Sequence, residues 1–261
     1  MKLRILTWNI NSLRLRMNLL REVVTATNPD IVCLQEIKVE DRLFPELDCR
    51  GLGFEHIAFA GMKSYNGVAI LSRHPVSEVE VLSRCGRDDC RHIKARVAGL
   101  ELHNLYIPAG GDIPDPKVNP KFAHKLDFIN ELAKIFVENR EKIVLVGDFN
   151  VAPLEHDVWS HKQLLDVVSH TPIEVELLAK FQASGGFIDA IRHFVPHTEK
   201  LYSWWSYRAK DWEKAERGRR LDHIWVSPDL APGLLSFSIE RNFRGRPSPS
   251  DHVPVLLEME M

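Results

Sequence analysis

Polar side chains flank apolar runs at several places along the chain, where predicted strands end or begin. They comprise amides, carboxylates, a phenol and an imidazole: Asn9, Glu36, Tyr106, Asp148, Asn150, Asp251 and His252. Because strand ends converge in space, we expect these side chains to meet. Carboxylates beside an amide and a histidine suit a hard divalent cation that keeps water and substrate oxygens in its shell. They also suit attack of water on phosphorus.

Each of these residues also has an ordinary structural interpretation. Asp148 could be a turn residue, Glu36 could cap a helix, and Asp251 and His252 could form a turn after Ser250. Taken singly, each is better explained as structural. Their joint placement favours a functional site, because a fold without one has no reason to put all of them beside apolar strands.

The apolar patterns predict the elements that must position these residues. Buried or alternating runs indicate strands over 3–8, 30–36, 67–71, 101–107, 143–148, 201–205, 222–226 and 253–259. Helical spacing indicates helices over 13–28, 122–136 and 172–184, the last with a capping box from Thr171 to Glu174. With no linker and no repeat, the pattern predicts two packed sheets with helices outside.

Composition limits the possible classes of protein. The 34 Lys and Arg residues and 36 Asp and Glu residues give a net charge of −2, so a nucleic-acid partner must be bound locally. With 261 residues, 44% of them hydrophobic, we expect one large domain over 1–261 and exclude disordered and fibrous classes. No apolar run approaches the ~20 residues of a membrane span, and no signal core is present, which predicts a cytoplasmic protein.

Short motifs spread along nearly the whole chain point to a known family. They are Trp8–Arg14, Leu34–Lys38, Tyr65–Ile70, Tyr106–Pro108, Gly147–Pro153, Tyr202–Tyr207, Arg220–Asp222 and Ser250–His252. In type and order they resemble the exonuclease III family of DNA-repair nucleases, within the endonuclease/exonuclease/phosphatase superfamily. The resemblance implies an α/β fold: a four-layer α/β/β/α sandwich of two mixed sheets flanked by helices, with the active site at one rim.

The resemblance also implies a role for each polar residue. Glu36 resembles the principal Mg²⁺ ligand, with Mn²⁺ a possible substitute. The expected metal site comprises Asn9, Glu36, Asp148, Asn150, Asp251 and His252. The expected catalytic set comprises Tyr106, Asp148, Asn150, Asp222 and His252. Either Asp148 or His252 could be the general base, because coupled groups share their titration.

Basic and aromatic residues concentrate late in the chain. Between 201 and 250, nine Lys and Arg residues stand against six Asp and Glu, and four of the six Trp lie there. This favours a local groove for a phosphate backbone, although Trp225 is better explained as core. The expected DNA contacts are Lys38, Tyr65, Trp204, Arg219, Arg220, Leu221 and Arg244.

Two positions depart from the family pattern. Ala109 stands where Asn or Gln is common, so one side-chain contact to DNA is missing or supplied elsewhere. Arg219 stands where an apolar or aromatic wall of the pocket for a base-free sugar is usual, while Trp204 and Leu221 retain the other walls. Arg219 could therefore narrow that pocket or grip a phosphate.

The leading interpretation is a Mg²⁺-dependent monomeric hydrolase acting on duplex DNA. The resemblance implies incision 5′ to abasic sites, 3′-to-5′ exonuclease activity and trimming of damaged or recessed 3′ ends, with no membrane or obligate protein partner. One alternative is a phosphoesterase of the same superfamily with a substrate other than DNA. Another is a nucleic-acid-binding regulator on an inactive nuclease scaffold, which ranks low because the metal and base residues are all present.

Overall fold

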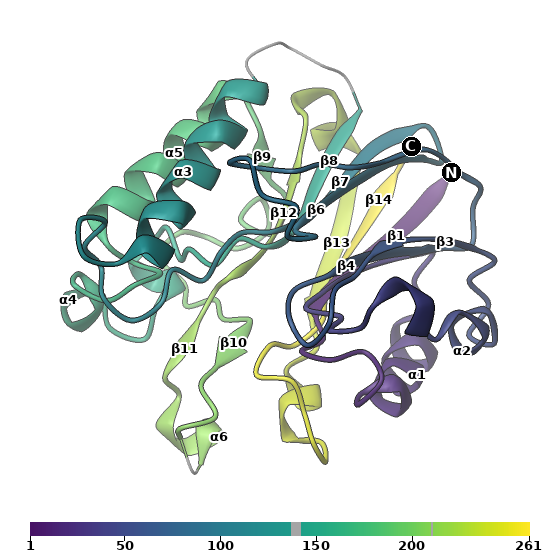
Figure 1. Ribbon diagram of the computed structural model, residues 1–261, viewed down its shortest axis with the longest axis horizontal. Helices are drawn as coiled ribbons and strands as arrows, with labels where there is room; N and C mark the ends of the chain where they lie inside the picture. Colours follow the sequence, from purple (N-terminus) through teal and green to yellow (C-terminus); the bar gives the residue numbers. More distant parts are fainter. Residues whose placement is uncertain (137–141, 210) are drawn as a thin grey trace.

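Two six-stranded sheets packed face to face form the centre of the molecule (Figure 1). The computed structural model describes residues 1–136, 142–209 and 211–261. In spatial order, the first sheet contains β13 (Leu234–Ile239), β14 (Val255–Glu260), β1 (Lys2–Asn9), β2 (Ile31–Gln35), β4 (Val68–Ser72) and β3 (His56–Ala60). The second contains β5 (Val76–Val81), β6 (His92–Val97), β7 (Leu100–Tyr106), β8 (Ile143–Asp148), β12 (Asp222–Val226) and β9 (Ile188–Asp189). A separate hairpin pairs β10 (Trp204–Trp205) with β11 (Gly218–Arg219).

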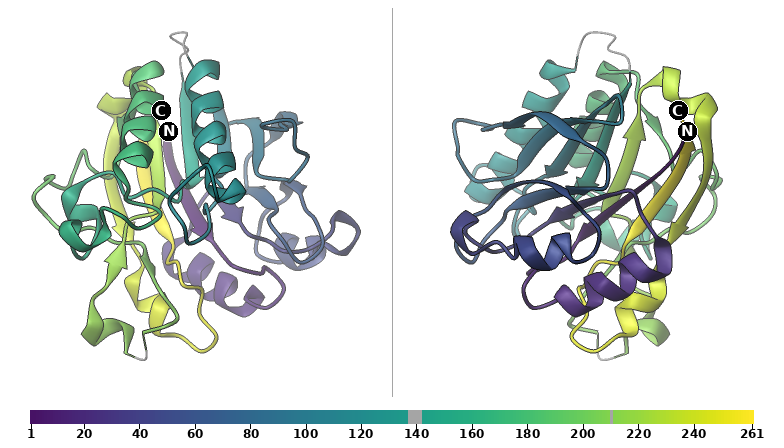
Figure 2. Two further views of the ribbon diagram at one scale, coloured as in Figure 1. Left: turned by 60° about the vertical axis from the view of Figure 1, so that its left-hand side comes forward. Right: turned by 90° about the vertical axis from the view of Figure 1, so that its right-hand side faces the viewer.

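Helices cover the two outer faces of this sandwich (Figure 2). The α-helices are α1 (Met17–Thr27), α2 (Glu46–Arg50), α3 (Pro120–Ile135), α4 (His161–Leu164), α5 (Pro172–Ser184) and α6 (Trp212–Ala215). Short 3₁₀ turns lie at η1 (Asp41–Leu43), η2 (Glu155–Asp157), η3 (Pro228–Gly233) and η4 (Arg241–Gly245). Helix α1 packs on the first sheet, and α3 and α5 pack on the second. The predicted four-layer α/β/β/α fold is therefore confirmed.

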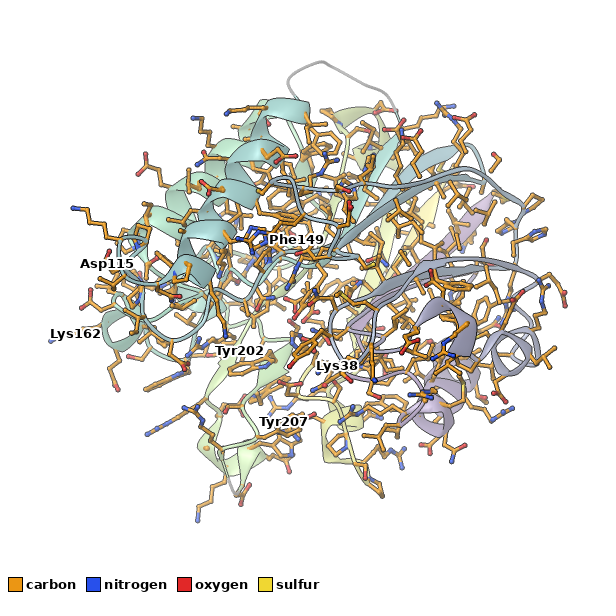
Figure 3. The ribbon with its side chains drawn as sticks, in the orientation of Figure 1. Lys38, Asp115, Phe149, Lys162, Tyr202 and Tyr207 are labelled. Atoms are coloured by element: carbon orange, nitrogen blue, oxygen red, sulfur yellow. The ribbon has the colours of Figure 1, made fainter. Side chains whose placement is uncertain are left out.

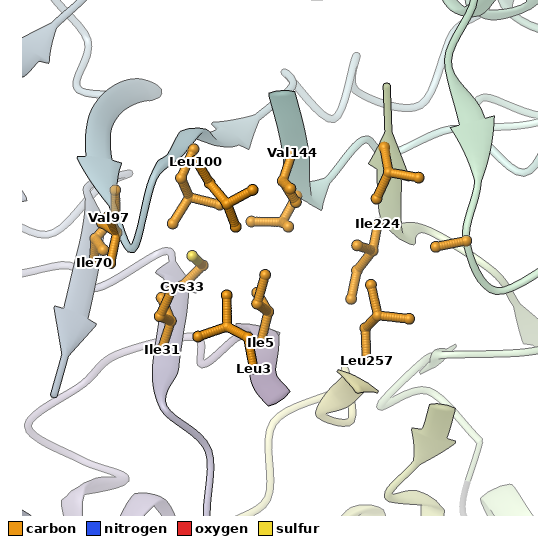
Figure 4. Close-up of a cluster of buried hydrophobic side chains, with 14 of the residues drawn as sticks. Leu3, Ile5, Ile31, Cys33, Ile70, Val97, Leu100, Val144, Ile224 and Leu257 are labelled. Atoms are coloured by element: carbon orange, nitrogen blue, oxygen red, sulfur yellow. The ribbon is translucent and has the colours of Figure 1, made fainter. Parts of the chain in front are cut away.

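The core between the sheets comes from alternate residues of the central strands. Leu3 and Ile5 of β1 point inward with Ile31 of β2, and they meet Val144 and Ile224 from the second sheet (Figure 4). The intervening side chains of β1 face α1 instead. Strands buried on both faces read as continuous apolar runs, which is why they were detectable in the sequence.

Each sheet contains one parallel pair joined by a helical crossover. Strand β1 runs parallel to β2, with α1 between them in sequence, and β7 runs parallel to β8, with α3 between them. Parallel neighbours need such crossovers, whereas the other pairs are antiparallel. Both parallel pairs direct their carboxyl ends to the same rim of the sandwich. The contact between Asn9, at the end of β1, and Asp148, at the end of β8, shows this. The rim therefore collects residues from both halves of the chain.

The predicted helices form, with shifted bounds at one of them. Helix α3 starts after Asn119, whose side chain accepts from Lys121 N, and α5 starts with the predicted capping box at Thr171. Helix α1 begins only at Met17, after a turn over residues 13–16. None of the helices in the described part of the chain has the length and apolarity to cross a membrane.

Six strands were missed in the sequence. Two of them, β9 and β11, have only two residues each. The other four are β3, β5, β6 and β13. Three of them, β3, β5 and β13, lie at sheet edges, and most of β5 is exposed. Edge strands need no buried face and so lack the apolar signal. The fourth, β6, lies inside its sheet but carries charged residues between its buried ones. Conversely, only Trp204–Trp205 of the expected strand over 201–205 pairs as a strand.

Candidate active site

Four predicted site residues lie at the carboxyl ends of the two parallel pairs. Asn9 ends β1, Glu36 follows β2, Tyr106 ends β7 and Asp148 ends β8. Glu36 adopts the left-handed backbone conformation, with φ of 51°. This sharp turn at the strand end is uncommon for a residue with a side chain and is often functional.

The carboxylate of Glu36 is held from three sides. Its Oε1 accepts from the Asn9 amide at 3.0 Å and from the Tyr106 hydroxyl at 2.8 Å. Its Oε2 lies 2.7 Å from the Lys38 ammonium. Burial would raise the pKa of Glu36, but the charge of Lys38 and the hydrogen bonds from Asn9, Lys38 and Tyr106 hold it below its ordinary value. Glu36 is therefore an ionised, oriented carboxylate at neutral pH.

Asp148 and Asn150 form a tight turn that fixes the Asp148 carboxylate. Asn150 has φ of 55°, its backbone N donates to Asp148 Oδ1 at 2.9 Å, and its side-chain amide donates to Oδ2 at 3.1 Å. Asn9 donates to the same Oδ2 at 2.8 Å, which joins this turn to Glu36. Burial raises the pKa of Asp148 to about 7, against the opposing charge of His252. Its carboxylate can thus exchange a proton near neutral pH.

His252 lies between two carboxylates. Its Nδ1 is 2.8 Å from Asp222 Oδ2, which also accepts from the Ser203 hydroxyl at 2.6 Å, and its Nε2 is 3.6 Å from Asp148 Oδ2. Burial alone would lower the pKa of His252, but the charges of Asp222 and Asp148 raise it to about 10. The imidazole is therefore a cation at neutral pH, oriented by Asp222 toward the rim.

Asp251 lies beside this centre and points toward the β10–β11 hairpin. Its Oδ2 accepts from the Trp204 indole at 2.9 Å and its Oδ1 from the Asn11 amide at 3.0 Å. Asn11 also accepts from Lys38 at 2.7 Å and lies near the Tyr207 hydroxyl; Lys38 and Tyr207 are labelled in Figure 3. Asn11 thus connects Lys38, which contacts Glu36, with Asp251.

Two contributors were not singled out from the sequence. Asn11 and Ser203 hold Asp251 and Asp222 respectively. Both lie inside the motifs that carry the family resemblance, so those motifs were the available signal. Neither stands at the end of a long apolar run, and the strand-end pattern therefore passes over them.

The donor set fits a hard divalent cation on the Glu36 side of the site. Four carboxylates face two cations, Lys38 and protonated His252, so an anionic phosphate needs further positive charge there. Glu36 supplies a partly exposed, ionised carboxylate with an amide beside it, as Mg²⁺ prefers. Asp148, Asp222 and His252 also place ligand atoms within 4.8 Å of one another. In that second group His252 Nδ1 is already bound to Asp222 Oδ2, so fewer of its atoms are free to hold an ion.

Residues 6–252 match the Endonuclease/Exonuclease/phosphatase family. The chain belongs to this family. Exodeoxyribonuclease III of Haemophilus influenzae is 29% identical, over 99% of this chain and 100% of the relative. The structure of an AP endonuclease from Archaeoglobus fulgidus superposes with a TM-score of 0.92 at 33% identity, covering 99% of this chain and 100% of the other. A Neisseria 3′ phosphatase bound to a product DNA hairpin gives 0.91 at 30% identity and the same coverage. The predicted family and nuclease-type hydrolase class are confirmed.

A cleft of about 590 Å³ opens next to the nuclease centre, on the side of Trp204. Arg219 lies 5.2 Å above the Trp204 ring, and Arg217 lies 4.7 Å above the Trp159 ring. Arg219 also donates to Ser169 Oγ at 2.7 Å and to Val168 O at 3.0 Å, so its guanidinium is held in place. The cleft thus has walls of stacked tryptophan and arginine.

The other expected DNA contacts separate into exposed and buried residues. Tyr65 is 69% exposed and lines a second cleft that reaches Tyr106, and Lys38 is partly exposed beside Glu36. Leu221 is buried in a small apolar cluster with Trp204 at its edge. Tyr65, Lys38, Trp204 and Arg219 therefore line the rim, whereas Leu221 supports it from below.

The structure contradicts the expectation that Arg220 and Arg244 contact DNA, because both side chains are buried. Arg220 is 1% exposed and donates twice to Asp157, at 2.8 and 2.9 Å, and once to Asp189 at 2.6 Å. Its guanidinium is committed to a buried ion-pair network and is not available to a DNA phosphate. Arg244 is also buried, donating to the Trp205 carbonyl beneath the Tyr207 ring. Both arginines stabilise the walls around the site.

Proposed function

We propose that this protein is a Mg²⁺-dependent DNA-repair nuclease that hydrolyses phosphodiesters of duplex DNA. Its substrates are abasic sites, cut on their 5′ side, and damaged or recessed 3′ ends. The observation that carries the proposal is the hydrogen-bonded chain from Glu36 through Asn9 to Asp148, with His252 adjacent. The names of relatives as exodeoxyribonuclease III, AP endonuclease and 3′ phosphatase support it.

Asp148 is the proposed general base. A base acts best with a pKa near the working pH, and burial raises the pKa of Asp148 to about 7. His252 is the poorer candidate, because Asp222 keeps it protonated. Asn150 holds the Asp148 carboxylate in one orientation throughout, through both its backbone N and its amide.

The remaining residues stabilise the negative charge of the phosphate. Protonated His252 offers an N–H and a positive charge to the phosphate, which gains negative charge during attack. Burial and the neighbouring Glu36 raise the pKa of Tyr106 well above its ordinary value, so its hydroxyl remains a neutral donor. Bound at Glu36, Mg²⁺ would supply charge neutralisation at the phosphate oxygens and at the leaving oxygen.

Arg219 is proposed to set the choice between abasic sites and 3′ ends. It covers one face of Trp204 and is tied to Ser169, which narrows the apolar wall available to a base-free sugar. Arg219→Leu should therefore raise abasic-site cleavage relative to exonuclease activity. An unchanged ratio of the two rates would remove Arg219 from the pocket.

The test of the proposed function is product mapping on an end-labelled duplex with one tetrahydrofuran abasic mimic, alongside an intact recessed-end duplex. The proposal expects a break 5′ to the mimic and stepwise shortening of the recessed 3′ end. A folded protein that leaves both duplexes intact would direct attention to phosphoesters outside DNA.

A further inference from the structure

The segment that follows Asp148 is anchored by its carbonyl groups. The three consecutive carbonyl oxygens of residues 150–152 each meet a nitrogen of a buried side chain. Lys125 Nζ lies 2.8 Å from the first, His223 Nε2 2.9 Å from the second, and His170 Nδ1 2.6 Å from the third. These side chains come from α3, β12 and the loop before α5, so the turn is held by distant parts of the fold.

Lys125 differs from the two histidines because its charge is entirely buried. Its side chain is 0% exposed, and its ammonium contacts the carbonyls of Asn150 at 2.8 Å and Ala109 at 3.4 Å together with the Glu174 carboxylate. One ammonium therefore joins the loop after β7, the loop after β8 and helix α5. Gly110 allows this approach, because a Cβ there would lie 2.9 Å from Lys125 Cδ.

Glu174 is itself fixed by other donors. It accepts from Ser169 N at 2.9 Å and 3.0 Å, from Thr171 N at 3.1 Å and from the Thr171 hydroxyl at 2.6 Å. A buried ion pair is weak evidence for stability, because desolvation of both charges offsets their attraction. Besides Glu174, the Lys125 ammonium donates to the carbonyls of Asn150 and Ala109, in the loops after β8 and β7.

The contact between Lys125 and the Asn150 carbonyl fixes the residue that orients Asp148. Asn150 is left-handed, and its backbone N and side-chain amide both bind the Asp148 carboxylate. Displacement of the Asn150 carbonyl carries the Cα of that residue with it, and so moves the backbone N and the side-chain amide that orient Asp148. A donor fixed by α3 and α5 opposes that displacement.

We propose that Lys125, held by Glu174, is a positioning residue for the nuclease reaction, acting through the Asn150 carbonyl on the orientation of Asp148. The claim that Lys125 affects the rate of cleavage rests on the proposed function. The claim that Lys125 holds the turn at Asn150 in place does not. Two measurements separate them: hydrogen exchange of backbone amides in the absence of DNA, and steady-state cleavage of the abasic duplex.

The variants are Lys125→Met and the double variant Lys125→Met/Glu174→Gln. The double variant removes both charges, so it leaves no uncompensated ion in the interior and carries the test if the single variant does not fold. The control is Val23→Ala, a fully buried position of α1, which belongs to a different apolar cluster from Phe149 and Val151 of the turn. All are compared at a temperature where each is folded.

For both Lys125 variants we expect amide exchange at Phe149, Asn150 and Ala152 to accelerate about tenfold or more, with Leu145 in β8 unchanged. We expect kcat to fall by ~10- to 100-fold with KM within about twofold, because misplacement of a reacting group lowers turnover more than binding. The control should show neither effect at the turn nor in kcat.

Wild-type exchange at the turn together with wild-type kcat in a folded Lys125 variant would overturn the proposal. A fall in kcat matched by Val23→Ala would likewise reduce Lys125 to a stability residue. If the wild-type protein cleaves no DNA, the proposed function fails, whereas faster exchange at Phe149 to Ala152 would still establish that Lys125 holds the turn.

Discussion

Substitution of Arg220 by methionine separates a structural arginine from a DNA-binding one. Arg220 makes three short contacts to Asp157 and Asp189, and all three side chains are largely buried. After the substitution Asp157 retains Arg192, at 2.5 Å, while Asp189 loses its closest cation. Breaking a buried pair from one side costs about 3–5 kcal/mol. With an unfolding entropy of about 0.55 kcal/mol/K for a chain of this size, Tm should fall by roughly 5–9 °C.

The assay pairs thermal unfolding with duplex binding over a range of salt concentrations, below the Tm of the variant. Affinity and salt dependence should remain at the wild-type values, because Arg220 is 1% exposed. Arg208→Met is the control: Arg208 is exposed in the cleft, so Tm should change by less than about 1 °C while the salt slope falls by about one. A wild-type Tm for Arg220→Met with a reduced salt slope would place Arg220 at the DNA and refute the reasoning.

Three further outcomes are expected. Asp148→Asn should lower kcat by ~10²–10⁴. The substitution should not lower Tm at pH 8, because a buried carboxyl whose pKa is raised to about 7 destabilises the fold when it is ionised. Normal turnover of this variant would remove Asp148 from the mechanism. Glu36→Gln should raise the Mg²⁺ concentration for half-maximal rate by about tenfold or more in a protein that still folds, and an unmoved Mg²⁺ titration would contradict this. Arg220 and Arg192 depress the pKa of Asp157 despite its burial, so this carboxylate stabilises the fold above its unfolded pKa of about 3.9 and loses that contribution as pH falls further. The Tm difference between wild type and Arg220→Met should therefore shrink between pH 5 and about pH 3, and a constant difference would exclude the linkage.

The meeting of the candidate site residues at one rim was predictable because most of these residues adjoin strong apolar signals in the chain. Asn9 and Asp148 end strands that are buried on both faces and read as nearly continuous apolar runs, and Tyr106 ends a strand with a looser alternation. The parallel pairs then bring their carboxyl ends to one rim. Local pattern and topology agree at these positions, so the sequence was enough to predict that these residues lie close together.

The arginines were not predictable in the same way. Arg219 and Arg220 are neighbours in a basic stretch, yet the first lines a cleft and the second is buried. The difference comes from Asp157 and Asp189, which lie 63 and 31 residues away from Arg220 in the chain. No short-range pattern indicates which arginine will meet such partners, and the same holds for Lys125 and Glu174, which are 49 residues apart.

The most direct test of the central claim is the rate of cleavage of the abasic duplex as Mg²⁺ is titrated, for the wild-type protein and Asp148→Asn. Asp148 is bound by Asn9 and lies 3.6 Å from His252, so the account predicts a saturable, EDTA-sensitive rate that the substitution nearly abolishes while the fold persists. Cleavage that is independent of added metal, or equal in the two proteins, would contradict it.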